Sequence, residues 1–346
     1  MLKRLREPFQ LADDVILAGQ RRIIHIPISR MSDHTPVTMS VHVVHGRRPG
    51  PTLFVSAAVH GDEIIGVEIC RRLLRAPQLN KIKGTLMVVP IVNSFGFLNH
   101  SRYLPDRRDL NRCFPGSEKG SLAGRLAHLF MQEIVERSDF GIDLHSAAIH
   151  RTNMPQIRMA TDKAETMALA EAFGAPVIIT SKLRDGSLRL AAQEQDVDVL
   201  LYEAGEGLRF DELSARIGVS GILRVMLKLG MVQRAPKSEL KPVLSSSSSW
   251  LRAPAGGLLR TFKGVGEAVD IGDVLGIVAD PFGDAEMDVT VNHSGVIIGR
   301  TNLPVVNEGD ALFHIAVPDV ASNLAAERNL TAHSNAAPMF DEDEII

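Results

Sequence analysis

The sequence is poor in cysteine, in tryptophan and tyrosine, and in long apolar runs. Only two cysteines, Cys70 and Cys113, occur among its 346 residues, together with one tryptophan and two tyrosines. Two cysteines exclude a disulfide-stabilised scaffold and argue against a structural zinc site made of thiolates. No run of 18 apolar residues is present, and the basic residues at 1–8 are followed by no apolar segment. We therefore expect neither a membrane-spanning helix nor a signal peptide, and we expect a cytoplasmic location.

The sequence also lacks an excess of charge of either sign. It holds 38 lysines and arginines against 41 aspartates and glutamates, a formal net charge of −3. Such a balance favours neither nucleic acid nor an anionic membrane as a partner. A small-molecule substrate is the expected partner, and homo-oligomerisation stays open.

The composition changes along the chain and suggests roughly two domains. Residues 1–233 alternate apolar runs with amphipathic stretches, as in an α/β domain. Residues 234–249 contain two prolines and a serine run, which is typical of a flexible linker. Residues 250–318 show short strands separated by glycine turns and predict a small all-β domain. Residues 319–346 are polar and acidic at the end, so we expect a disordered tail.

Apolar runs with β-branched residues predict the strands of the first domain. Residues 52–59 form such a run, and residues 64–74 follow with the apolar stripe of a helix. Residues 84–92 and 140–144 are further buried strands, and 197–202 is another. Strand, helix and strand in succession form a βαβ unit. We predict a mixed, mostly parallel sheet flanked by helices.

Four side chains capable of metal or proton chemistry stand where these strands end. His60 and Glu63 lie on one tight turn after the first strand, His145 ends the third, and Glu203 follows the last. The carboxyl ends of parallel strands meet at one edge of a sheet, where α/β proteins bind ligands. Two histidines and one carboxylate form a zinc set with an open fourth position, the pattern of catalytic rather than structural zinc. Glu203 is then the candidate for the carboxylate that takes and returns a proton.

Four motifs in this order resemble the succinylglutamate desuccinylase/aspartoacylase family, which belongs with zinc carboxypeptidases of the carboxypeptidase A type. The motifs are His60-Gly61-Asp62-Glu63, Asp109-Leu110-Asn111-Arg112-Cys113-Phe114-Pro115-Gly116, Asp143-Leu144-His145, and Glu203 after a strand. The resemblance covers about residues 40–320. It implies that 1–233 is a zinc-dependent catalytic domain of zinc carboxypeptidase-like fold, and that the C-terminal domain resembles a barrel-sandwich.

The resemblance also implies a role for individual residues. His60, Glu63 and His145 would bind one zinc ion (Zn2+) per chain, and Glu203 would act as general base and then general acid. In the polar loop of residues 99–119, Arg102 would polarise the scissile carbonyl and stabilise the oxyanion.

The Asn111-Arg112 pair would hold the substrate carboxylate. The segment 105–108 is longer than its counterpart in aspartoacylase. For this reason the resemblance does not specify which acyl group or amine the substrate carries.

Several neighbouring residues have a plainer interpretation. Glu206 is the nearest rival of Glu203, and His150 is more readily a satisfied polar side chain than a ligand. Asp143 is a candidate partner of a ligand histidine, as is Asp62. Asp109 is expected to be an acceptor that orients the arginines, and Cys113 to be an inert thiol.

The prediction is a zinc-dependent amidohydrolase, a deacylase of N-acylated amino acids or related small amides. One alternative is a metallocarboxypeptidase that acts on peptides. The other is a non-catalytic member of the fold, against which the complete set of His60, Glu63, His145 and Glu203 argues.

Overall fold

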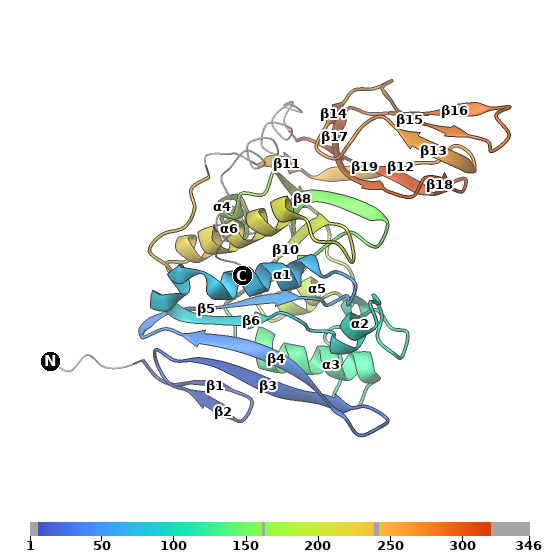
Figure 1. The fold of residues 1–346 in the computed structure, drawn as a ribbon. Coiled ribbons are helices and arrows are strands. Elements are labelled where there is room, and N and C mark those ends of the chain that lie inside the picture. The colour runs from blue at the N-terminus through green and yellow to red at the C-terminus, as the bar shows by residue number, and fades with distance from the viewer. Residues whose placement is uncertain (1–5, 161–162, 239–241, 320–346) are drawn as a thin grey trace, which may run out of the picture.

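A mixed sheet of 13 strands dominates the molecule. The computed structural model describes residues 6–160, 163–238 and 242–319, whose arrangement is drawn in Figure 1. Ten strands follow in the order β12-β19-β17-β8-β10-β7-β5-β6-β4-β3, while β9 pairs with β8 and β11, and β14 pairs with β17. The strands of this sheet are β3 (Arg21–Arg30), β4 (Pro36–His45), β5 (Arg48–Ala57), β6 (Lys83–Val89), β7 (Phe140–His145), β8 (Arg151–Met159), β9 (Val177–Thr180), β10 (Asp198–Gly205), β11 (Val243–Ser245), β12 (Ser247–Arg252), β14 (Ala268–Val269), β17 (Gly295–Thr301) and β19 (Ala311–Val317).

Two smaller sheets accompany the large one. A two-stranded sheet near the N-terminus pairs β1 (Phe9–Leu11) with β2 (Asp14–Ile16). A four-stranded sheet in the C-terminal part has the order β16-β15-β13-β18. Its strands are β13 (Gly257–Thr261), β15 (Val274–Ala279), β16 (Glu286–Thr290) and β18 (Val305–Val306).

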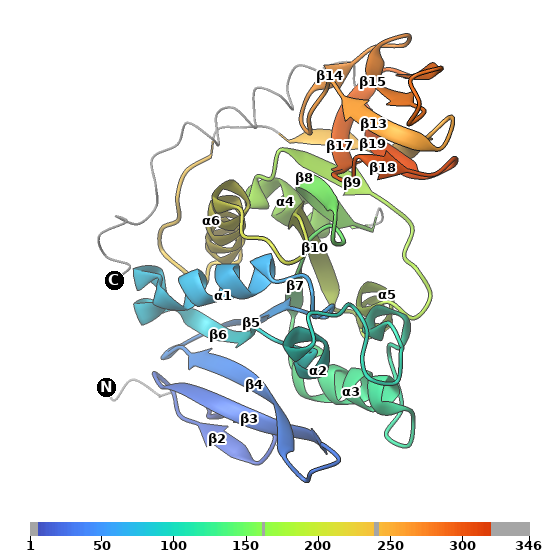
Figure 2. The same ribbon diagram turned by 45° about the vertical axis from the view of Figure 1, so that its right-hand side comes forward.

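Helices cover both faces of the large sheet (Figure 2). They are α1 (Ile65–Arg75), α2 (Ser94–Leu98), α3 (Leu122–Phe130), α4 (Ala164–Phe173), α5 (Leu188–Gln193) and α6 (Glu212–Lys228), with the 3-10 turns η1 (Pro77–Lys81) and η2 (Leu110–Arg112) and the π-helical turn η3 (Met131–Val135). Side chains of a strand point alternately to opposite faces. Leu53 and Val55 of β5 therefore pack with α1, α4 and α6, while Phe54 packs with α3 and α5 on the other face.

The expected mixed sheet flanked by helices is confirmed, but fewer of its strand pairs are parallel than predicted. The centre β6-β5-β7-β10 is parallel, and so is the branch β8-β9-β11. The other pairs among the described strands of this sheet are antiparallel. Antiparallel neighbours need only a short connection, and residues 31–35 are enough to join β3 to β4.

The C-terminal strands continue the large sheet. β17 pairs with β8 through Gly299 and Asn153, and β12 pairs with β19. The expectation of a flexible linker at 234–249 is wrong for its second half, because residues 243–245 and most of the serine run are strands. Backbone pairing with β9 and β19 holds these residues in place whatever their side-chain composition.

The proposed domain boundaries stay a prediction, and the tail expected at 319–346 lies outside the described residues except for Asp319. No helix in the described ranges combines the length and the apolar character that crossing a bilayer requires.

Candidate active site

The turn between β5 and α1 positions His60 and Glu63 beside the ends of β7 and β10. Parallel pairing sets β7 between β5 and β10, with Glu203 directly opposite His145. The turn itself lies tightly against α2, because a Cβ on Gly61 would stand 1.9 Å from the backbone carbon of Gly96. Only glycine fits at this close approach. The predicted convergence of strand ends at one sheet edge is thus the observed geometry.

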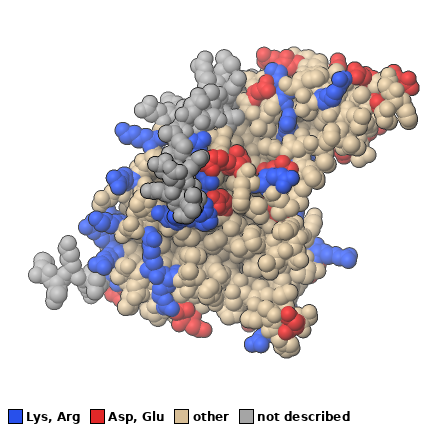
Figure 3. Space-filling view, in the orientation of Figure 1, with Lys and Arg blue, Asp and Glu red and all other residues tan. Residues whose placement is uncertain are grey.

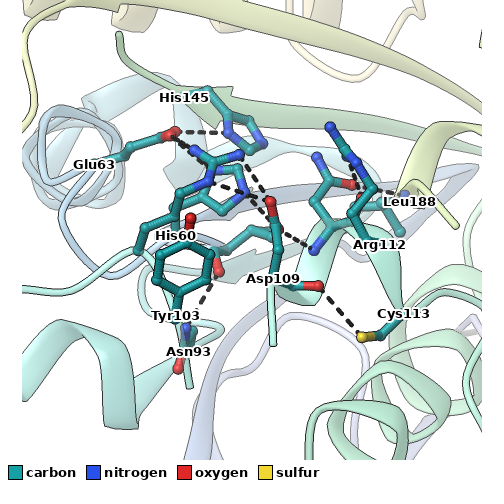
Figure 4. Close-up of polar contacts among 12 residues, drawn as sticks. His60, Glu63, Asn93, Tyr103, Asp109, Arg112, Cys113, His145 and Leu188 are labelled. Carbon is teal, nitrogen blue, oxygen red and sulfur yellow. Dashed lines mark hydrogen bonds and ion pairs between the residues drawn. The ribbon is translucent and has the colours of Figure 1, made fainter. Parts of the chain in front are cut away.

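His60, Glu63 and His145 point toward one another in Figure 4. The Nδ1 atom of His60 lies 2.7 Å from Oε1 of Glu63, and Nδ1 of His145 lies 2.7 Å from Oε2 of the same carboxylate. All three side chains are buried, with 3% or less of each residue exposed. A carboxylate and two imidazoles therefore meet where very little of each residue is exposed to solvent.

Two further carboxylates fix the orientation of these imidazole rings. Oδ2 of Asp143 lies 2.7 Å from Nε2 of His145, and Ser56 donates to Oδ1 of Asp143 at 2.7 Å. Oδ1 of Asp109 lies 3.0 Å from Nε2 of His60. Each Nε2 atom is therefore held by a carboxylate, and each Nδ1 atom is directed at Glu63. Asp143 is a ring partner, as anticipated, whereas the partner of His60 is Asp109 rather than Asp62.

Burial and the neighbouring charges shift the pKa values of this cluster in opposite directions. Burial alone would raise the pKa of Glu63, but His60 and His145 outweigh it and hold that pKa far below its usual range. Burial alone would lower the pKa of each histidine; for His145 the charges of Asp143 and Glu63 outweigh it and raise the pKa well above its ordinary value. The pKa of His60 is also raised, chiefly by Glu63 and Asp109 against the effect of burial. Glu63 is accordingly an anion that attracts cations.

The donor set fits a zinc ion. Zinc binds imidazole nitrogens and carboxylate oxygens at about 2.0–2.2 Å, so tetrahedral ligands lie roughly 3.4 Å apart. The ligand atoms of His60, Glu63 and His145 all lie within 4.8 Å of one another. Ligand histidines usually donate their other ring nitrogen to a carboxylate, and Asp109 and Asp143 occupy those positions here. The group could therefore bind a metal ion.

Arg102 lies directly beside this group. Its Nη1 atom is 3.0 Å from Oε1 of Glu63, and Nη2 donates to Oδ2 of Asp109 at 3.0 Å. Burial alone would lower the pKa of Arg102, but the charges of Glu63 and Asp109 outweigh it and raise that pKa. Asp109 thus orients an arginine, as predicted, and also the ring of His60.

Asn111 and Arg112 stand farther along the same loop and line the same cavity. The backbone N–H of Leu188 donates to Oδ1 of Asn111 at 2.9 Å, which ties the loop to the start of α5. Arg112 is exposed, and its Nη1 donates to the backbone oxygen of Asn111. An amide and a guanidinium therefore lie next to each other in the lining of the cavity.

Glu203 faces the cavity from β10, half-buried. Asn153 of β8 donates from Nδ2 to Oε2 of Glu203 at 2.8 Å, which fixes the orientation of the carboxylate. The rival Glu206 instead accepts from the backbone N–H of His150 and from Nδ2 of Asn302, and does not line the cavity. The structure therefore places Glu203, and not Glu206, with the histidines.

The cavity that holds these residues measures about 660 Å³. Sequence reasoning missed several of its side chains: Arg151, Asn153, Arg158, Lys182, Arg184, Arg189, Trp250 and His314. Burial, with the nearby charge of Arg158, lowers the pKa of Arg189 to about 10, so this side chain remains a cation near neutral pH.

Trp250 stacks on His314 with ring centroids 4.5 Å apart, and both come from C-terminal strands. No sequence motif predicts that these residues line the cavity, because strand pairing brings them there. Cys113 stands aside, with Sγ donating to the backbone oxygen of Asp109.

Comparison with known proteins identifies the family. The model of the succinylglutamate desuccinylase/aspartoacylase catalytic domain matches residues 49–229, more than half of the chain. The chain belongs to this family. The expectation drawn from the four motifs is therefore confirmed.

Individual relatives support the same assignment. The N-alpha-acetyl-L-2,4-diaminobutyric acid deacetylase of Halomonas elongata is 27% identical over 311 residues, which cover 86% of this chain and 91% of the relative. A succinylglutamate desuccinylase/aspartoacylase from Rhodobacter sphaeroides has 26% identity and a TM-score of 0.79, and the match covers 91% of this chain and 100% of that structure. The product-bound ectoine utilization protein EutE (DoeB) of Ruegeria pomeroyi shares the fold, with a TM-score of 0.78, 23% identity, and coverage of 92% of this chain and 100% of that structure.

Proposed function

We propose that the protein is a zinc-dependent hydrolase that cleaves the amide bond of an N-acylated amino acid or a related small amide. One observation carries the proposal: the histidine and carboxylate group of His60, Glu63 and His145 shares a cavity with Glu203, which stands opposite His145 on the neighbouring strand. Hydrolysis by an activated water requires a metal-binding group and a separate carboxylate that accepts the proton of the water.

His60, Glu63 and His145 would hold one zinc ion per chain. A bound zinc ion polarises a carbonyl group and lowers the pKa of a water molecule toward about 7. Asp109 and Asp143 keep the two Nδ1 atoms aimed at the metal position through their contacts with the Nε2 atoms.

Glu203 removes a proton from the attacking water and later donates it to the departing amine nitrogen. The oxygen–carbon bond forms as the proton moves to the carboxylate, and the carbon–nitrogen bond breaks as the proton leaves it. The hydrogen bond from Asn153 holds Oε2 of Glu203, so Oε1 is the oxygen assigned to the proton. Arg102, beside Glu63, donates to the carbonyl oxygen as negative charge develops there.

Asn111 and Arg112 bind the carboxylate of the substrate, since a guanidinium can donate two parallel hydrogen bonds to such a group. Arg158 and Arg189 add positive charge to the same cavity. This excess of cations supports an anionic substrate, which an N-acylated amino acid is at neutral pH. The name of the Halomonas relative, a deacetylase of an N-acetylated amino acid, supports the same substrate class.

We also propose that residues 250–318 form a small β domain of barrel-sandwich type that completes the wall of the cavity. The support is the four-stranded sheet of this region, its own apolar core, and the position of Trp250 and His314 at the cavity.

The test is a zinc-loaded activity screen over N-acetyl, N-succinyl and N-formyl amino acids, with short peptides alongside. The Glu203→Gln variant is expected to lose about 10²–10⁴-fold in kcat while its zinc content stays at one per chain. Glu206→Gln, which changes a carboxylate outside the cavity, is the matched control and is expected to keep its activity. Unchanged turnover in Glu203→Gln, or a purified protein that takes up no zinc, would refute the proposal. Activity confined to peptides would make the protein a peptidase instead.

A further inference from the structure

A second cavity lies at the edge of the large sheet opposite to the candidate active site. It measures about 560 Å³. Arg48 begins β5, Lys83 begins β6, and Arg21 begins β3, and all three line this cavity. His60, in contrast, follows the other end of β5, and a strand of ten residues spans roughly 30 Å. The two cavities are therefore separate sites.

Three separate segments of the chain bring positive charge to this second cavity. Its lining includes Arg21, Arg47, Arg48, Lys81 and Lys83 and, within the described part of the chain, no aspartate or glutamate. The whole sequence has more acidic than basic residues, so a lining of one sign is not a consequence of composition. Lysines and arginines gather on the corresponding side of the molecule in Figure 3, over the ends of β4, β5, β6 and α1.

The described ranges supply no counter-charge to these five side chains. Among the described residues, none of the five side chains has a hydrogen bond or an ion pair. The nearby arginines of α1 behave differently, since Arg71 and Arg72 both bind Glu68. Side chains that project cations into one concavity without a partner raise the local concentration of anions.

The floor of the cavity is apolar. Leu79, Ile82, Met231 and Val232 form it and are buried. Gln20 and Gln233 also line the cavity and add amide groups to the cations. A concave site of a few hundred cubic ångströms with an apolar floor and a small number of polar groups is typical of small-ligand sites.

We propose that this cavity, lined by Arg21, Arg47, Arg48, Lys81 and Lys83, is a second binding site that takes a small polyanion with several phosphate or carboxylate groups. A ligand with one negative charge leaves most of the five cations without a counter-ion. A polyphosphate or polycarboxylate neutralises several at once, and its oxygens accept charge-assisted hydrogen bonds from guanidinium and ammonium groups. The site acts independently of amide hydrolysis.

The experiment is isothermal titration calorimetry of the full chain with inorganic triphosphate, with citrate, and with acetate as the monoanion. We expect saturable polyanion binding that the substitutions in this cavity weaken, and no acetate binding that they affect; the tighter of the two polyanions assigns phosphate or carboxylate chemistry. The Arg47→Gln/Lys83→Gln double variant is expected to bind at least tenfold more weakly. Both residues are exposed, so this variant is expected to fold and to keep its hydrolase activity.

Two controls separate this site from general charge effects and from the catalytic cavity. Arg30→Gln/Lys119→Gln removes two exposed cations outside both cavities and is expected to bind as the native protein does. Arg112→Gln, in the catalytic cavity, is also expected to leave the polyanion affinity unchanged. Absence of saturable binding, an equal loss in the Arg30→Gln/Lys119→Gln control, or a loss in Arg112→Gln would each overturn the proposal.

Discussion

The hydrogen bond between Asp143 and His145 offers the sharpest test of the metal site. Asp143 is 1% exposed, lies 2.7 Å from Nε2 of His145, and accepts from Ser56 at 2.7 Å. Asp143→Asn keeps the shape of the side chain and removes its charge. The hydroxyl of Ser56 can turn to accept from the new amide, which leaves the amide oxygen for His145. We expect the protein to fold and the ring to stay in place.

Two effects of this change oppose each other. Loss of the charged partner makes His145 a weaker ligand, and changes of this kind cost about 10–100-fold in metal affinity, or about 1.4–2.8 kcal/mol. Asp143 is also the largest of the influences that, against burial, raise the pKa of His145. Its removal lowers that pKa and reduces competition from the proton. Competition disappears as the pH rises, so the full loss of affinity is expected at about pH 9 and a smaller loss at pH 7.

The assay is competition between the protein and a zinc chelator at these two pH values, which requires no substrate. Asp139→Asn is the matched control, because Asp139 precedes the same strand at its far end and accepts from the backbone N–H of Thr52. Its zinc affinity is expected to equal that of the native protein. If Asp143→Asn bound zinc within twofold of the native protein at both pH values, the assignment of His145 as a ligand would be wrong.

Three other predictions concern the walls of the catalytic cavity. Burial, with a contribution from Arg158, lowers the pKa of His314 to about 3, so the unfolded chain binds a proton below pH 6.5 that the folded protein does not; the free energy of unfolding should fall by about 2 kcal/mol from pH 7 to pH 5 on this account, and urea unfolding of His314→Phe should lack that loss. Trp250 is the only tryptophan and lines the cavity, so a saturating product amino acid should change the intrinsic fluorescence; constant emission would contradict its position at the site. Asn153→Ala removes the hydrogen bond to Glu203, and kcat should fall about tenfold or more at unchanged KM and zinc content; a change in KM alone would refute the positioning role.

The sequence was sufficient for the parts of the site that depend on strand ends. His60 and Glu63 follow an apolar run, and His145 and Glu203 close two others. The β-branched and apolar character of these runs predicts buried strands, and parallel neighbours bring their carboxyl ends together. This local rule was enough to predict that the four side chains share one edge. The parallel pairing of β7 with β5 and with β10 bears this out, because it places Glu203 opposite His145.

The rest of the site depends on pairing between distant segments. Arg158 and Asn153 lie on β8, which pairs with β10 in the antiparallel direction. A βαβ pattern in the sequence does not imply this pairing. Trp250 and His314 reach the cavity because β12 pairs with β19. The serine run predicts a linker for the same reason. Its composition is typical of flexible segments, and it forms a strand because it pairs with β19. Side-chain periodicity describes a strand but does not name its neighbour.

Asp109 joins the group of His60, Glu63 and His145 to the loop of residues 99–119 by hydrogen bonds. One oxygen of this carboxylate lies beside Nε2 of His60, and the other accepts from Arg102. The backbone N–H of Asn111 also donates to Asp109, at 2.9 Å. The loop of residues 99–119 therefore orients His60, a proposed metal ligand, through Asp109. It also contains the proposed donors to the oxyanion and to the substrate carboxylate. Substitution of Asp109 must then weaken zinc binding and substrate binding together. Substitution of Arg112, whose side chain donates to the backbone oxygen of Asn111 and not to the metal-binding group, must affect the substrate alone.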